Sequence, residues 1–167
     1  MEAKVGKFFE SVANFFVGGD SIPWCDREIV AGCEQEVTEA SKNSSDDFKN
    51  ECIMRLSWAL VHSREPEDVN RGIAMLESSL DNTSSALKVR EKLYLLAVGY
   101  YRIRDHSKSR DLVERCLKIE PDWRQAQSLK KAIEDQIKKD GIIGIGIAAT
   151  AVGLVAGGIA AAFARRN

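Results

Sequence analysis

The feature that most constrains this chain is an uncharged, apolar stretch near its C-terminal end. Residues 141–164 contain no Asp, Glu, Lys or Arg. A helix rising about 1.5 Å per residue would extend over about 36 Å here, enough to cross a hydrocarbon core of about 30 Å. We therefore expect a single membrane-spanning helix that inserts after synthesis and leaves the preceding residues in the cytosol.

The rest of the chain divides around this span. We expect four parts, which are an N-terminal amphipathic arm over residues 1–20, a cytosolic helical-repeat domain over 21–139, the transmembrane tail anchor over 141–164, and a short basic end over 165–167. The N-terminal stretch is interrupted by charged residues and lacks the apolar core of a secretory signal. The C-terminal span is therefore the expected targeting element.

The composition argues against several classes of function. A net charge of −1 does not favour nucleic-acid binding. The four cysteines form no Cys-x-x-Cys pair and are not spaced with the two histidines as zinc ligands would be. Phosphate-binding glycine loops and nucleophile–histidine pairs are also missing from the sequence. These patterns predict free, buried thiols, no metal or cofactor, and a protein that is not an enzyme.

Apolar residues recur at helical spacing throughout the soluble part, and the three prolines stand at helix starts or in loops. The fold class is therefore all-α, a bundle of six to seven helices followed by the transmembrane helix. The predicted soluble helices span about 3–17, 26–41, 46–63, 66–80, 86–103, 107–119 and 123–139.

Internal repetition is the next signal. The segment around Leu56 can be superposed on the segment around Leu93, with small or apolar residues at the positions that tetratricopeptide repeats reserve for them. Ala97 and Ser109 are small where the two helices of the second repeat should cross closely. Generic helical hairpins without repeat ancestry are the alternative.

Two stacked repeats predict a concave surface that binds a partner through the first helix of each repeat. By repeat position, the predicted groove residues are Met54, Ser57, Val61, Arg64, Tyr94, Val98, Tyr101 and Arg102. The alternative is that Tyr94 and Val98 simply pack beneath the N-terminal segment.

Several stretches resemble the mitochondrial fission 1 protein family. They include residues 94–102, 58–63 and 71–77, and the Lys138–Gly141 junction before a Gly/Ala/Ile-rich span. The resemblance covers the chain from about Glu51 to its end. The aromatic N-terminal stretch and residues 22–26 look more like plant members of the family than animal or fungal ones.

The resemblance implies a six-helix bundle with two tetratricopeptide-like repeats on a C-terminal anchor. It also implies an adaptor on the outer mitochondrial and peroxisomal membranes. This adaptor would promote fission by recruiting a dynamin-related GTPase or its linker proteins, which would carry out the GTP chemistry. One alternative is an outer-membrane import receptor for targeting peptides, and another is a protein that remodels membranes directly.

The two ends of the chain carry further candidate residues. The N-terminal stripe of Phe8, Phe9, Phe15 and Phe16 suits a core helix, a removable lid over the groove, or a membrane-surface helix. Basic residues flank the span and are candidates for membrane targeting, namely Lys138, Lys139, Arg165 and Arg166. Gly153 and Gly157 have the spacing of a helix-dimer contact, which also arises by chance in a Gly/Ala-rich segment.

Overall fold

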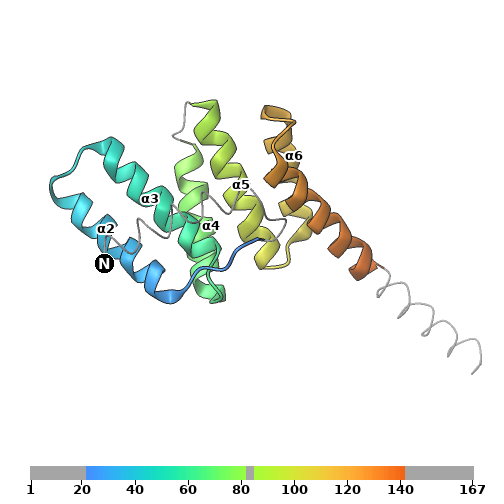
Figure 1. Ribbon diagram of the computed structural model, residues 1–167, viewed down its shortest axis with the longest axis horizontal. Coiled ribbons are helices and arrows are strands. Elements are labelled where there is room, and N and C mark those ends of the chain that lie inside the picture. The colour runs from blue at the N-terminus through green and yellow to red at the C-terminus, as the bar shows by residue number, and fades with distance from the viewer. Residues whose placement is uncertain (1–21, 82–84, 142–167) are drawn as a thin grey trace, which may run out of the picture. The chain divides into compact units, whose positions relative to one another are not determined.

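The structure is a computed structural model that describes residues 22–81 and 85–141 (Figure 1). Five helices are α2 (Arg27–Asn43), α3 (Asp46–Val61), α4 (Pro66–Leu80), α5 (Ala86–Arg102) and α6 (His106–Ile119). Residues 124–141 are also helical. The all-α prediction is confirmed for this part of the chain, where every helix lies within three residues of its predicted bounds.

Several predicted features lie outside the described residues. They are the arm with its four phenylalanines, the two glycines of the dimer spacing, Arg165 and Arg166, and the predicted span from residue 142 onward. Within 22–81 and 85–141, no helix combines the length and the hydropathy that a bilayer crossing requires.

Local sequence signals explain where the helices begin. The Ser45 side chain accepts a hydrogen bond from the Phe48 backbone nitrogen at 3.4 Å, and Pro66 occupies the first turn of α4. Asp105 caps α6 in the same way, by accepting from the Lys108 backbone nitrogen at 3.1 Å. Each cap satisfies a backbone N–H that has no partner within its own helix.

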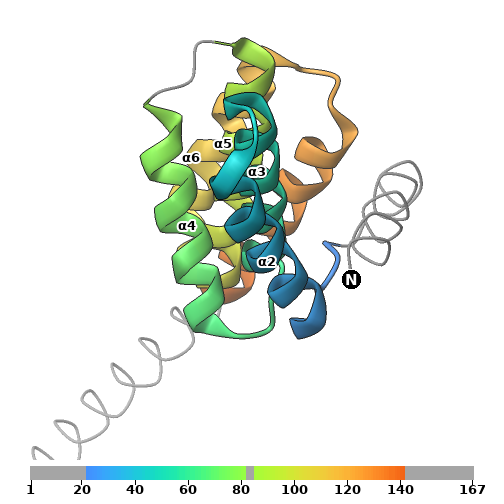
Figure 2. The same ribbon diagram turned by 90° about the vertical axis from the view of Figure 1, so that its left-hand side faces the viewer.

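Helices that follow one another in the chain pack side by side, from α2 to α6 (Figures 1 and 2). In addition, α3 contacts α5, which makes these two helices the centre of the bundle. Their buried residues run almost without interruption, over 56–61 in α3 and 93–100 in α5. A helix that is apolar on every side is one that neighbours surround.

Close helix crossings occur where the repeat pattern predicts them. The Ser109 hydroxyl donates to the Ala97 carbonyl oxygen at 2.6 Å, between α6 and α5. A Cβ atom at Gly72 would stand 2.8 Å from Val61 Cγ1 and 2.9 Å from Leu60 Cβ, between α4 and α3. Both positions therefore need a small residue, and the prediction for Ala97 and Ser109 is confirmed.

The described residues fall into two compact units, which are residues 22–133 and residues 134–141. The first unit contains α2 to α6 and the core. The second contains exposed Lys138 and Lys139, and the environment of Gly141 is open, with no atom within 4 Å of a Cβ placed there.

The four cysteines are free and buried, as predicted. Burial raises the pKa of Cys25, Cys33 and Cys116 to about 12. A thiol with so high a pKa carries almost no thiolate at neutral pH, so these residues pack as small apolar side chains.

Candidate functional site

The structure divides the eight predicted groove residues into two groups. Met54, Tyr101 and Arg102 are half-buried and Arg64 is exposed. Ser57, Val61, Tyr94 and Val98 are buried. Only the first group keeps surface that a partner can contact.

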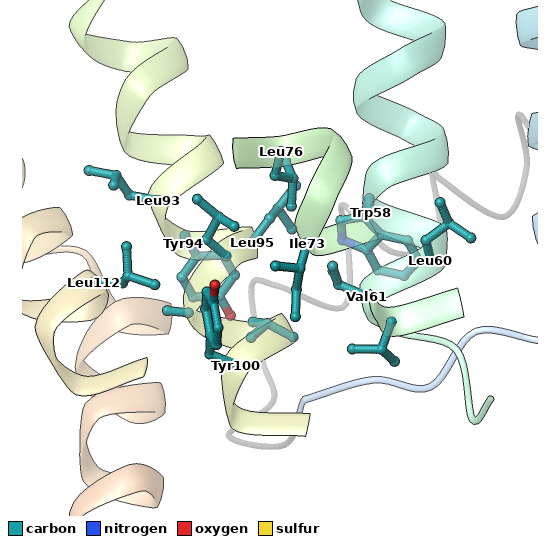
Figure 3. Packing of buried hydrophobic residues seen from close by; sticks show 14 of the residues in the cluster. Trp58, Leu60, Val61, Ile73, Leu76, Leu93, Tyr94, Leu95, Tyr100 and Leu112 are labelled. Carbon is teal, nitrogen blue, oxygen red and sulfur yellow. The ribbon is translucent and has the colours of Figure 1, made fainter. Parts of the chain in front are cut away.

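Val61 and Val98 correct the prediction of an open groove lining, because both have no exposed surface. Val61, the last residue of α3, packs against α4 and α5 (Figure 3). Its Cγ1 atom would meet a Cβ added at Gly72 in α4 or at Gly99 in α5. Ser57 also turns inward, with its hydroxyl donating to the Ile53 carbonyl oxygen at 2.8 Å. The correction arises because α3 is packed on by α2, α4 and α5, so positions assigned to a concave face are covered by helices.

Tyr94 is buried and packs against the aromatic ring of Trp123. Its ring centroid lies 4.8 Å from that of Trp123, and the Arg90 guanidinium lies 4.6 Å from the Trp123 ring centroid. Arg90 in turn pairs with Glu120 at 3.3 Å. Burial raises the pKa of the Tyr94 hydroxyl well above its ordinary value. Tyr94 therefore acts as a core residue that joins α5 to the segment after α6.

Arg64 and Arg102 meet at a tryptophan from a distant part of the chain. The Arg102 guanidinium carbon lies 3.4 Å from the Trp24 ring centroid, and that of Arg64 lies 4.9 Å from it. We call Trp24, Arg64 and Arg102 the Arg–Trp cluster. Cation–aromatic contacts of this kind are favourable because the ring face is electron-rich.

Backbone contacts hold Trp24 in this place. One Arg102 Nη2 atom donates to the carbonyl oxygens of Ile22 at 3.2 Å and Pro23 at 2.8 Å. The Cys25 backbone nitrogen donates to the His62 carbonyl oxygen at 2.8 Å, which forms an isolated parallel bridge between Cys25 and Ser63. The extended residues 22–25 therefore join the end of α3, in the first repeat, to the end of α5, in the second.

The side chain of His62, whose carbonyl oxygen bonds to Cys25, is completely buried. Its ring stacks on Trp58 with centroids 4.0 Å apart, and its Nδ1–H donates to the Trp58 carbonyl oxygen at 2.7 Å. Complete burial, with a smaller contribution from the positive charge of Arg102, lowers the pKa of His62 to about 3. His62 is therefore neutral at physiological pH and serves as a packing residue.

The charge of the Arg–Trp cluster is not neutralised by the described residues, since neither Arg64 nor Arg102 forms an ion pair there. Burial lowers the pKa of Arg102 to about 10, and the nearby charge of Arg64 contributes to the lowering. Two like charges on one ring repel each other, so the site favours an anionic group.

The described residues hold no group of three His, Cys, Asp or Glu side chains that is arranged for a metal ion. What the Arg–Trp cluster offers is recognition, through a partly exposed tryptophan and two guanidinium groups. Sequence reasoning included Arg64 and Arg102 but missed Trp24. The only sequence signal for it was a tryptophan beside Pro23 in a short interhelical segment, which does not reveal its partners.

Two family models match the chain. The model described as the Fis1 N-terminal tetratricopeptide repeat matches residues 51–83, and the Fis1 C-terminal tetratricopeptide repeat matches residues 90–142. The first range begins within α3 and includes α4, and the second begins within α5 and includes α6, so the two predicted repeats are confirmed.

Known proteins resemble the chain over most of its length. Mitochondrial fission 1 protein A of Arabidopsis thaliana is 63% identical over 100% of both chains. Mitochondrial fission 1 protein of Mus musculus is 32% identical, over 83% of this chain and 84% of the mouse protein. The higher identity to the plant protein agrees with the plant-type sequence features.

A solved structure shares the fold. The crystal structure of yeast Fis1 in complex with an Mdv1 fragment, which contains the N-terminal extension and coiled-coil domains, matches with a TM-score of 0.60 at 21% identity. The match covers 71% of this chain and 90% of the yeast chain.

Proposed function

The chain belongs to the mitochondrial fission 1 protein family, whose members are non-enzymatic adaptors, and on this premise we propose that it promotes the division of mitochondria and peroxisomes. In this proposal it is tail-anchored in the outer mitochondrial and peroxisomal membranes. Its cytosolic repeats recruit a dynamin-related GTPase or a linker protein of that GTPase.

The observation that carries the proposal is the similarity to the Arabidopsis protein over the full length of both chains. Similarity that includes the ends covers the predicted arm and the predicted anchor as well as the repeats. The yeast protein of the same fold was crystallised with an Mdv1 fragment, which supports a protein-binding role for the repeats.

The described residues supply a surface for that role. Met54, Arg64, Tyr101 and Arg102 belong to the first helix of a repeat or to the residues that follow it, and all four retain exposed surface. We propose that partner binding uses these four residues, while the four buried members of the predicted groove support them from the core.

The membrane attachment proposed here uses the lysines before the predicted span. Lys138 and Lys139 are exposed on the helical residues 134–141. Near an anionic leaflet each lysine adds attraction of about 1 kcal/mol. Lysine side chains can also extend to the headgroups with their apolar stems along the span.

The test is organelle morphology in cells that lack the protein. We expect elongated mitochondria and peroxisomes, normal length after the full chain is restored, and no rescue by a chain truncated after Asp140. A control chain carrying Arg124→Gln, at an exposed position outside the proposed surface, should rescue as the parent does.

Two outcomes would contradict the proposal. Organelles of normal length with defective protein import would support an import receptor instead. Rescue by the truncated chain would contradict the requirement for a membrane anchor.

A further inference from the structure

Trp24 is one of the large apolar residues that keep exposed surface in the described part of the chain. The residue keeps 43% of its area exposed although its backbone is fixed by hydrogen bonds on both sides. An exposed tryptophan on a fixed backbone loses little conformational entropy when a partner covers it. Tryptophan and arginine are also the residue types most enriched at the energetic centres of protein interfaces.

The two guanidinium groups beside Trp24 form no ion pair with the described residues. Four other described arginines have carboxylate partners, namely Arg55, Arg71, Arg90 and Arg110. Arg64 and Arg102 have no such partner among the described residues, and the same is true of Arg27, Arg104, Arg115 and Arg124. What distinguishes Arg64 and Arg102 is that both guanidinium groups lie over one tryptophan ring. The Nε atom of Arg102 is buried and has no hydrogen-bond acceptor among the described residues either.

We propose that the Arg–Trp cluster is the docking site for an acidic peptide segment of the partner protein. A carboxylate of the segment lies against the Arg64 guanidinium, and a neighbouring apolar side chain covers the Trp24 ring. This inference rests on the proposed adaptor function and adds to it the chemistry of the segment that is recognised. Arg102 acts as a positioning residue, because its Nη2 donors already hold the carbonyl oxygens of Ile22 and Pro23.

The charges beside the cluster favour a peptide over a membrane surface. Asp26 and Glu65 are exposed and directly follow Cys25 and Arg64 in the chain. An extended anionic bilayer would approach these carboxylates together with the arginines and would be repelled by them. A single carboxylate on a peptide can contact Arg64 and avoid both.

The test uses the full chain in phosphatidylcholine nanodiscs, with 5-fluorotryptophan at its three tryptophan positions. The probe is an acetylated peptide with a single Glu between Leu residues, and the matched control peptide has Gln in place of Glu. Trp24→Phe identifies the Trp24 fluorine resonance, while the resonances of Trp58 and Trp123 serve as internal controls.

We expect the acidic peptide to shift the Trp24 resonance saturably and the Gln peptide to leave it unchanged. Arg64→Gln should raise the dissociation constant about fivefold, as loss of one accessible charge contact does. Arg64→Glu should abolish the shift, and Arg124→Gln should leave it unchanged. Because Arg64 is exposed, neither substitution at this position disturbs the core.

Three results would overturn the proposal. The first is no shift of the Trp24 resonance with the acidic peptide. The second is an equal effect of Arg64→Gln and Arg124→Gln, which would indicate non-specific charge attraction. The third is a shift that cardiolipin in the nanodisc produces without peptide and that Arg64→Gln removes, which would assign the site to the membrane.

Failure of this inference can be told apart from failure of the adaptor function. If Arg64→Glu restores organelle length as well as the parent chain does, the docking site is wrong while the adaptor role stands. If the parent chain itself has no effect on organelle length, the adaptor role fails.

Discussion

The Ser109 hydroxyl donates a 2.6 Å hydrogen bond to the carbonyl oxygen of Ala97, and both residues are completely buried where α6 crosses α5. This bond joins the two helices of the second repeat. In the first repeat, Gly72 lies against Leu60 and Val61 and leaves no room for a side chain. Small residues therefore set the helix spacing in both repeats, and the first two predictions test them.

At Ser109, we expect Ser109→Ala to lower the free energy of unfolding by about 1 kcal/mol, because it removes one buried hydrogen bond. Ser109→Leu should cost about 2 kcal/mol or more, because its larger side chain must force the helices apart. Urea denaturation of the full chain followed by circular dichroism measures both. Exposed Ser107→Ala is the control, and an equal effect there would contradict the role given to Ser109.

For Gly72, a change to alanine should destabilise the fold even though alanine favours helices by about 1 kcal/mol. The new Cβ would lie 2.8 Å from Val61 Cγ1 and 2.9 Å from Leu60 Cβ, so the helices must separate. We expect a net loss of about 1–2 kcal/mol. The matched control is Gly141→Ala, where a Cβ meets open space, and this variant should be at least as stable as the parent.

Arg104 offers a stabilising change. Its φ of 64° lies in the left-handed region, which a side chain disfavours. The Asp105 and Arg104 backbone nitrogens donate to the Tyr100 and Tyr101 carbonyl oxygens at 2.9 and 3.1 Å, which is the helix ending that usually carries glycine here. Arg104→Gly should raise the free energy of unfolding by about 0.5–1 kcal/mol. A lower midpoint in thermal denaturation would contradict this account.

His62 predicts how stability depends on pH. Its pKa is about 3 in the folded chain and about 6.5 when exposed, so below pH 6.5 only the unfolded state takes up this proton. The free energy of unfolding is therefore unaffected by His62 above that pH. Below it, the free energy of unfolding decreases by up to about 1.4 kcal/mol per pH unit. His62→Gln should be less steep than the parent between pH 6.5 and 5. Parallel profiles would show that His62 does not titrate on unfolding.

Helix positions followed closely from the sequence because their signals are local. The Ser45 cap, Pro66 and the apolar periodicity act within a few residues of each helix end. The α3 helix nevertheless ends at Val61, before the predicted Ser63. The cause is a local signal that the prediction overlooked, because the helical partner of the His62 carbonyl oxygen would be the nitrogen of Pro66, which carries no hydrogen. The Cys25 nitrogen donates to that oxygen instead.

The groove prediction needs correction at Val61 and Val98, which have no exposed surface. Repeat position correctly identified which helices are equivalent, but it assigned Val61 and Val98 to an open surface. The unbroken apolar run from Leu56 to Val61 was the available warning, since a helix with one open face should show polar residues there. Such a run indicates a helix with neighbours on several sides.

The sequence by itself determined the helices, the two repeats, the small residues at their crossings and the family, because each depends on spacing within a short stretch. Only the tertiary structure decided which residues keep exposed surface and which are covered. It alone brought Trp24 to Arg64 and Arg102, from three separate segments of the chain. No sequence spacing predicts the contact of Trp24 with the two arginines, because it depends on how the ends of α3 and α5 pack against residues 22–25.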